Sequence, residues 1–252
     1  MTHKAGFVNI IGNPNVGKST LMNALVGEKL SIITAKAQTT RHRILGIVNG
    51  DEHQIIFSDT PGILQPAYQL QESMMDFVKS AFDDADILIY MVEIGEKELK
   101  DEAFFNKITA SKKPVLLLLN KIDTSNQEQL EAQAQLWQQK VPNAEFIAIS
   151  ALEGFNVKNV FDRILELLPE SPAYYPKDQL TDKPERFFVN EKIREKILNR
   201  YEEKTDILHA ASQLWIDAVI QPQETRSWIS MGIDIANHAP NEEKFNMGIL
   251  QV

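Results

Sequence analysis

The stretch from residue 7 to residue 20, FVNIIGNPNVGKST, decides the fold. It contains Gly12, four intervening residues and then Gly17-Lys18-Ser19, which is the spacing of a phosphate-binding P-loop. An apolar run precedes the loop and a helix-forming run, LMNAL, follows it. Such a loop surrounds an anion with backbone N–H groups, and the positive end of the following helix points at the same place. The stretch therefore predicts a site for phosphate groups between a buried strand and a helix.

Two side chains of this loop add specific chemistry. Lys18 can reach the outer phosphates of a nucleotide as a point charge, and the Ser19 hydroxyl can bind a Mg²⁺ ion that bridges them. The competing interpretation is a glycine-rich turn with an incidental lysine, which the flanking strand and helix disfavour. We predict that the loop as a whole contacts the nucleotide, through Gly12, Asn13, Pro14, Asn15, Val16, Gly17, Lys18, Ser19 and Thr20.

Composition and charge exclude several classes of protein. The 252 residues are 43% hydrophobic and 24% charged, as in ordinary soluble globular proteins. With 35 acidic and 26 basic residues the net charge is −9, so RNA binding would need a local basic patch. The absence of cysteine excludes disulfides and cysteine-ligated metals. Neither a signal peptide nor a membrane-spanning run is visible, so we expect a cytoplasmic protein.

Strand and helix signals alternate along the first two thirds of the chain. Alternation of this kind predicts an α/β fold: a doubly wound, mostly parallel six-stranded sheet. Four residues, GDEH, separate the second strand from the third, so these two should form an antiparallel hairpin at one edge. The predicted strands are residues 5–11, 43–49, 54–58, 86–93, 114–119 and 145–149, and the predicted helices are residues 18–25, 69–83, 100–110, 126–140 and 157–168.

A proline-rich stretch, LLPESPAYYPKDQLTDKP, marks a domain boundary. We predict a nucleotide-binding domain over residues 1–170, a linker with the start of a further region over residues 171–203, and a helical tail over residues 204–252. Residues 185–203 read as a charged amphipathic helix whose apolar positions are Phe187, Phe188, Ile193, Ile197 and Leu198. Two further helices are expected over residues 209–220 and about 224–236.

Three short motifs follow predicted strands, where open α/β sheets bind ligands. In Asp59-Thr60-Pro61-Gly62, the aspartate can hold the hydration shell of Mg²⁺ and the Gly62 N–H can sense a γ-phosphate. In Asn120-Lys121-Ile122-Asp123, the last carboxylate can accept two hydrogen bonds from guanine N1–H and its amine, a donor pair that adenine lacks.

The other groups around the base have more modest roles. The Asn120 amide is expected to contact the other edge of the base, and the stem of Lys121 to pack over its plane. Backbone N–H groups of Ser150-Ala151-Leu152 are expected near guanine O6. A lone triplet of this kind is common, so it supports the prediction only because it follows the other motifs in the expected order and at the expected spacing.

The polar stretch KAQTTRHR, residues 36–43, lacks apolar periodicity and is expected to be a loop. It offers a threonine hydroxyl as a second Mg²⁺ ligand, Thr40 in the first place and Thr39 as the alternative. Loops of this kind are ordered by the γ-phosphate and Mg²⁺ and released after hydrolysis. The alternative interpretation is a solvated basic loop without such a role.

These motifs come in the order found in GTPases related to translation factors. Together GNPNVGKSTLMNAL, KAQTTRHRI, DTPGI, NKID and SAL closely resemble the Era family of bacterial GTPases. The segment YYPKDQLTDKPERFFVNEKIREKIL resembles the Era linker between the G domain and an RNA-binding KH domain, so the likeness covers residues 1 to about 203. The resemblance implies a GTP-hydrolysing switch that uses GTP, GDP and Mg²⁺. It also implies small ribosomal subunit assembly, 16S rRNA binding, a monomeric state and peripheral contact with the inner face of the cell membrane.

The resemblance also bears on the hydrolysis rate. Many GTPases carry a glutamine after DTPG that positions the attacking water, whereas this chain has Ile63, so slow intrinsic hydrolysis is expected. Related GTPases with an apolar residue there use a K⁺ ion held by a P-loop asparagine, which Asn15 matches. The alternative is that Asn15 only shapes the loop. The residues expected to act in hydrolysis are Lys18, Thr40, Gly62 and Asn15.

The tail departs from the family pattern. No GxxG loop of a KH domain appears after residue 203, which removes the usual RNA-binding element. The stretch LWIDAVI, with Pro222 and the following ETR, resembles the carboxyl-terminal end of acyl-CoA carboxyltransferase subunits. The alternative is a helical extension that buries Trp215, Val219, Trp228 and Ile229.

Overall fold

The computed structural model describes residues 3–33, 39–205 and 220–238. The chain folds into two compact units, Met1–Ile197 and Leu198–Val252. The domain boundaries expected after residues 170 and 203 stay predictions. In the structure, residues 171–197 belong to the first unit.

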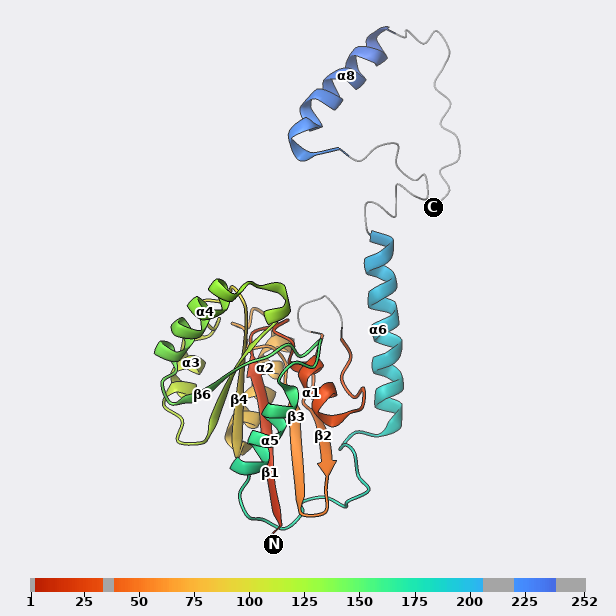
Figure 1. Cartoon of the computed structure of the whole chain (residues 1–252). Helices are drawn as coiled ribbons and strands as arrows, with labels where there is room; N and C mark the ends of the chain where they lie inside the picture. Colours follow the sequence, from red (N-terminus) through yellow and green to blue (C-terminus); the bar gives the residue numbers. More distant parts are fainter. Residues whose placement is uncertain (1–2, 34–38, 206–219, 239–252) are drawn as a thin grey trace. The chain divides into compact units, whose positions relative to one another are not determined.

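The first unit is built on a six-stranded sheet with the order β2-β3-β1-β4-β5-β6 (Figure 1). β2 runs antiparallel to β3 at one edge, and the other neighbouring strands are parallel. The predicted fold class is therefore confirmed. The strands are β1 (Lys4–Gly12), β2 (Ile44–Asn49), β3 (His53–Asp59), β4 (Ile87–Glu93), β5 (Val115–Asn120) and β6 (Ala144–Ala148).

Helices connect the strands and begin and end within about two residues of the predicted limits. They are α1 (Lys18–Val26), α2 (Gln69–Asp84), α3 (Glu102–Thr109), α4 (Gln127–Lys140) and α5 (Val157–Leu167), with a short 3-10 helix η1 (Ile122–Thr124). Asp101 caps α3 by accepting a hydrogen bond from the Phe104 N–H, and Asn126 caps α4 in the same way through the Gln129 N–H.

Helices cover both faces of the sheet, which explains why its central strands are almost continuously apolar. In β4, Ile89 packs with α1 and α5 on one face, whereas the neighbouring Tyr90 packs with α2, α3 and α4 on the other. Successive side chains of a strand point to opposite faces, so a strand covered on both sides must be apolar at every position. The carboxyl ends of the parallel strands are left for the loops that carry the motifs.

The linker after α5 covers the open edge of the sheet. The Ile47 N–H of β2 donates to the Leu180 carbonyl at 2.8 Å, and the Gln54 side chain contacts the backbone of Tyr174 and Tyr175. An uncovered edge strand would present unpaired N–H and C=O groups to other chains. This coverage accounts for the inclusion of residues 171–197 in the first unit.

Helix α6 (Glu185–Thr205) begins at the predicted residue, but an acidic pair is buried on it. Glu191 and Glu195 are 9% and 5% exposed, whereas the apolar Ile193 and Ile197 are 52% and 62% exposed. Glu195 is stabilised because it accepts from the Ile33 N–H and pairs with Lys29. Ile193 and Ile197 thus lie outside the buried face of this helix, whereas Phe187 packs against the core.

The second unit is described over residues 198–205 and 220–238. It contains a 3-10 turn η2 (Pro222–Glu224) and α8 (Thr225–His238), close to the helix predicted over residues 224–236. The helix predicted over residues 209–220 lies outside the described residues except for its last position, and so does LWIDAVI. The likeness of the tail to carboxyltransferases stays a prediction. Among the described helices, none has the length and apolar character needed to cross a bilayer.

Candidate nucleotide-binding site

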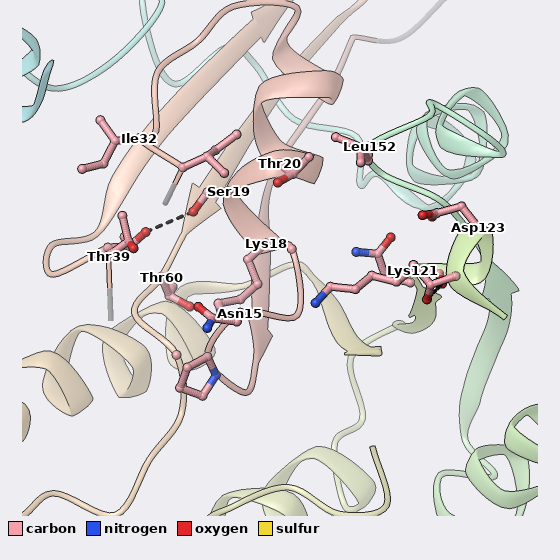
Figure 2. A pocket seen from close by; sticks show the side chains of 17 residues that line it. Asn15, Lys18, Ser19, Thr20, Ile32, Thr39, Thr60, Lys121, Asp123 and Leu152 are labelled. Atoms are coloured by element: carbon pink, nitrogen blue, oxygen red, sulfur yellow. Dashed lines mark hydrogen bonds between the residues drawn. The ribbon is translucent and has the colours of Figure 1, made fainter. Parts of the chain in front are cut away.

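A pocket of about 480 Å³ lies at the carboxyl edge of the sheet, where the loops after β1, β3 and β5 meet. Two groups of labelled side chains face each other across it in Figure 2: Lys121, Asp123 and Leu152 on one side, and Ser19, Ile32 and Thr39 on the other. Its full lining is Pro14, Asn15, Gly17, Lys18, Ser19, Thr20, Ile32, Ile33, Thr39, Thr40, Thr60, Gly62, Asn120, Lys121, Asp123, Thr124 and Leu152. The structure thus brings together residues from all the predicted motifs.

Two glycines allow the three loops to approach one another. A Cβ atom on Gly17 would lie 2.4 Å from Nδ2 of Asn120, and the φ angle of +100° there already disfavours other residues. A Cβ atom on Gly62 would lie 2.6 Å from the backbone of Pro14. Because Gly17 also precedes α1 without a side-chain cap, the N–H groups of the first helical turn are available to an anion.

Lys18 is held inside the P-loop. It is 6% exposed, and its Nζ donates to the carbonyls of Gly12 at 3.2 Å and Asn13 at 2.7 Å. Burial lowers the pKa of Lys18 to about 8, although the negative charges of Asp59, Glu96 and Glu93 act in the opposite direction. A buried ammonium group is costly unless negative charge lies near it. The phosphates of a nucleotide in the pocket would supply that charge.

Three oxygen-bearing side chains converge beside Lys18. The Ser19 hydroxyl donates to Oδ2 of Asp59 at 2.7 Å, the Thr40 hydroxyl lies 3.2 Å from the same oxygen, and the two hydroxyls are 3.0 Å apart. Asp59 is fully buried, and its Oδ1 has no hydrogen-bond partner among the described residues. Burial raises the pKa of Asp59, against the effect of its hydrogen bond with Ser19 and the charge of Lys18.

This donor set fits Mg²⁺, which prefers hydroxyl, carboxylate and phosphate oxygens. A divalent cation would also give the unpaired Asp59 oxygen a partner and would favour its ionised form. The geometry favours Thr40 as the second hydroxyl, because its Oγ1 lies beside both the Ser19 hydroxyl and the Asp59 carboxylate.

The carboxylate predicted to select the base, Asp123, lies at the opposite end of the pocket. Its Oδ1 accepts a hydrogen bond from the Ser150 hydroxyl at 2.5 Å, and the side chain is exposed to the pocket. Lys121 has a φ of 64°, and its ammonium pairs with the Glu93 carboxylate. Ser150 and Glu93 therefore orient the two side chains that are expected to contact the base.

Asn120 has a structural role that the sequence did not indicate. Its Nδ2 donates to the Val16 carbonyl at 2.7 Å, and its Oδ1 accepts from the Ala151 N–H at 2.9 Å. The buried amide thus ties the P-loop to the Ser150-Ala151-Leu152 loop. Asn120 also lines the pocket, so its contact with the base stays a prediction. The Ala151 N–H is engaged in the same contact, and the Leu152 side chain, 77% exposed, lies at the pocket mouth.

Four predicted residues have side chains that are buried or hydrogen-bonded within the protein. Thr60 donates its hydroxyl to the Ile10 carbonyl at 2.7 Å, and Val16 and Pro61 are buried. The Asn13 side chain bonds to the loop after β4. These residues can contribute to nucleotide binding through their backbone groups.

The sequence patterns did not indicate Ile32, Ile33 and Thr124, which also line the pocket. Ile32 and Ile33 form an apolar pair just before the polar loop, and that pair is the signal that was available. The contact that fixes Ile33, to Glu195, spans 162 positions of sequence. No local pattern reports such a contact.

Comparisons with known proteins agree with this geometry. A sequence profile for the 50S ribosome-binding GTPase family matches residues 7–121. A crystal structure of Era in complex with MgGDPNP and nucleotides 1506–1542 of 16S ribosomal RNA is 41% identical, with a TM-score of 0.73, over 77% of this chain and 67% of that chain. A variant of Aquifex aeolicus Era bound to GDP and aluminium fluoride is also 41% identical, with a TM-score of 0.72, over 77% and 66% of the two chains.

A more distant structure, elongation factor SelB from Methanococcus maripaludis with GPPNHP, is 20% identical with a TM-score of 0.52, over 66% of this chain and 34% of that one, and shows the fold alone. The chain spans about two thirds of the length of the Era chains that it matches. With a matching GTPase profile, 41% identity to Era and the motifs assembled around one pocket, this chain belongs to the Era family of GTPases.

Proposed function

We propose that this chain is a GTP-binding and GTP-hydrolysing switch that works with Mg²⁺. One observation supports the proposal: a buried lysine, two hydroxyls bonded to a buried carboxylate and the carboxylate of the NKID motif meet at one pocket. The Era structures in complex with MgGDPNP and with GDP and aluminium fluoride support it. Positioning and electrostatics supply most of the catalysis of phosphoryl transfer, and this pocket offers both.

The residues of the chain divide this work between them. Lys18 and the N–H groups at the start of α1 bind the phosphates and stabilise the charge that develops on them. Ser19, Thr40 and Asp59 would hold Mg²⁺, which neutralises charge on the phosphate oxygens when it is bound. Gly62 lines the pocket and lies close to Pro14 of the P-loop, so we expect its N–H to donate a hydrogen bond to the γ-phosphate. Loss of the γ-phosphate would release Gly62 and Thr40.

Two measurements test the proposal. Calorimetry with Mg²⁺ should detect binding of GTP and GDP and at least about 100-fold weaker binding of ATP, because a mismatched buried hydrogen-bonding group is strongly rejected. Single-turnover phosphate release should then detect hydrolysis. Binding without any release would favour the alternative, a nucleotide-dependent binding module, and absence of GTP binding would refute both.

Slow intrinsic hydrolysis is part of the proposal. Ile63 is fully buried, and it packs with Leu64, Met74 and other residues of the core below the pocket. Its side chain therefore cannot orient a water molecule. Asn15, which lines the pocket with a φ of 67°, is the residue that we propose to hold a stimulating K⁺ ion.

We expect hydrolysis to be about tenfold faster in KCl than in NaCl, which corresponds to about 1.4 kcal/mol of transition-state stabilisation. Asn15→Gly should remove this difference while GDP affinity stays the same, because glycine adopts the positive φ without strain. Asn15→Asp keeps an oxygen ligand at the same place and should retain the K⁺ effect. Equal rates of the wild type in the two salts would contradict the assignment.

We further propose the small ribosomal subunit as the partner that reads the switch, since one of the matched Era structures is bound to a 16S rRNA fragment. We expect the protein in the cytoplasm, because GTP and this partner both occur there. We also expect it to be a monomer, and its contact with the membrane stays a prediction. A labelled RNA of the same nucleotides, 1506–1542, should bind more tightly with GDPNP than with GDP. Equal binding with both nucleotides would mean that the RNA does not read the nucleotide state, and the absence of binding would contradict this partner.

A further inference from the structure

The loop between β4 and α3, residues 94–101, contacts the P-loop at Asn13 and contains a largely buried carboxylate, Glu96. Its Oε1 accepts from Nδ2 of Asn13 at 2.6 Å, and its Oε2 accepts from the Glu93 N–H at 3.2 Å. Glu96 does not line the nucleotide pocket, so it does not contact the nucleotide directly. Its connection to the site passes through Asn13.

Asn13 connects this loop to Lys18. Its side chain is 6% exposed, and the three hydrogen bonds that it makes reach Glu96, the Glu98 carbonyl at 3.0 Å and the Lys100 N–H at 3.1 Å. Its backbone carbonyl accepts from Nζ of Lys18 at 2.7 Å. A change in the Asn13 side chain would therefore move a carbonyl that holds the main phosphate-binding cation.

We propose that Glu96 is a positioning residue: its carboxylate fixes Asn13 and thereby the shape of the P-loop, so that nucleotide affinity depends on the ionised form of this side chain. This inference rests on the proposed function of the pocket. An ionised carboxylate accepts from both Asn13 and the Glu93 N–H in charge-assisted hydrogen bonds. When the carboxyl group is protonated, one of its oxygens carries a hydrogen and becomes a donor. The group then loses its contact with either Asn13 or the Glu93 N–H.

The surroundings of Glu96 place its titration near neutral pH. Burial, and to a smaller extent the charge of Glu93, raise the pKa of Glu96, whereas hydrogen bonds from the Glu93 backbone and Asn13 and the charge of Lys18 oppose the rise. The net pKa is about 7. Tyr90 of β4 also faces this carboxylate, but burial raises its pKa far above the physiological range. Among these neighbours, Lys18 has a pKa lowered to about 8, so its titration must be separated from that of Glu96.

The direction of the pH dependence follows from which protonation state of Glu96 favours nucleotide binding. If ionised Glu96 favours the nucleotide-bound P-loop, binding lowers its pKa below about 7. The advantage is then complete above pH 7 and is lost as the pH falls through the lower value of the bound state. Dividing the wild-type affinity by that of Glu96→Gln at each pH cancels the titration of the phosphates, which both proteins share. The charge of Glu96 also raises the pKa of Lys18, so the fall of this ratio is followed between pH 7 and pH 5.5, below the pKa of Lys18.

The experiment is a titration of GDP with Mg²⁺ into the full chain from pH 5.5 to pH 8, on the wild type, Glu96→Gln and Glu98→Gln. At pH 8, Glu96→Gln should bind about tenfold more weakly, as expected for one lost charge-assisted hydrogen bond. This ratio should fall towards one at pH 5.5. Glu98→Gln removes a charge from the same loop but leaves the Glu98 carbonyl in place, so it should match the wild type.

Three outcomes would overturn the inference. Tighter binding by Glu96→Gln would mean that repulsion between the carboxylate and the phosphates dominates. A tenfold loss that is the same at every pH would assign a purely structural role, and an unchanged affinity would assign none. In each case the wild type still binds GDP, which separates these outcomes from failure of the proposed function. Thermal unfolding of each variant checks that it is folded.

Discussion

Replacement of Lys18 by alanine should abolish nucleotide binding. Lys18 is buried within the P-loop, and in the free protein its ammonium is held by the carbonyls of Gly12 and Asn13. These partners are neutral, and the nearby carboxylates of Asp59, Glu96 and Glu93 do not offset the cost of burying the ammonium, so phosphates would stabilise it further. Loss of a buried cation that contacts phosphate oxygens costs several kcal/mol, and we expect affinity for GDP and GTP to fall by about 1,000-fold or more.

The control for this variant is Lys79→Ala. Lys79 lies on α2, is 57% exposed and pairs only with the neighbouring Asp76 among the described charges, so its loss removes one positive charge without touching the pocket. Calorimetry should find wild-type affinity for Lys79→Ala and no measurable heat for Lys18→Ala. Micromolar affinity retained by Lys18→Ala would refute the assignment of the P-loop.

The second large effect is expected at Asp123, as a change of base specificity. A carboxylate accepts from guanine N1–H and from the exocyclic amine, whereas an asparagine at the same place offers one acceptor and one donor. That pair matches xanthine, which has a carbonyl where guanine has the amine. Asp123→Asn should therefore weaken GTP binding by about 100-fold or more and make xanthosine triphosphate the preferred ligand.

The structure explains why we expect a large change of base specificity. The Ser150 hydroxyl donates to Asp123, so the side chain is oriented before a base arrives. Ser150→Ala is the matched variant: it should keep the preference for guanine while lowering the affinity by about fivefold to tenfold, the usual size of one hydrogen bond. If Asp123→Asn binds GTP as the wild type does, the carboxylate does not read the base. Competition between GTP and xanthosine triphosphate measures the preference directly.

Helix α6 illustrates where a pattern of apolar residues is insufficient. Its apolar positions suggested a buried face that contains Ile193 and Ile197, but Glu195 is the residue that contacts the segment after α1. Helical periodicity identifies a possible apolar face of a helix. It does not predict against which surface of the folded chain that helix packs. In this protein the available surface offers Lys29 and the Ile33 N–H, which favour a carboxylate.

The same distinction applies within the site. Asp59 and Asp123 were found from motifs, because each motif follows a strand and parallel strands deliver their carboxyl ends to one edge. The partners of Asn120 and Asn13 were not found. An amide can bind a ligand or a neighbouring loop with equal chemistry, and the choice depends on which loop packs beside it.

The one-dimensional pattern was therefore sufficient for the mostly parallel six-stranded sheet, the antiparallel edge, the approximate limits of the helices and the meeting of the motifs at one edge of the sheet. These features depend on short-range periodicity and fixed spacings, which a chain carries locally. The buried face of α6, the bridging role of Asn120 and the link from Glu96 to Lys18 depend on contacts between residues far apart in sequence. Such contacts are determined by how the loops pack, because a buried polar group must bond to whatever neighbour the folded chain provides.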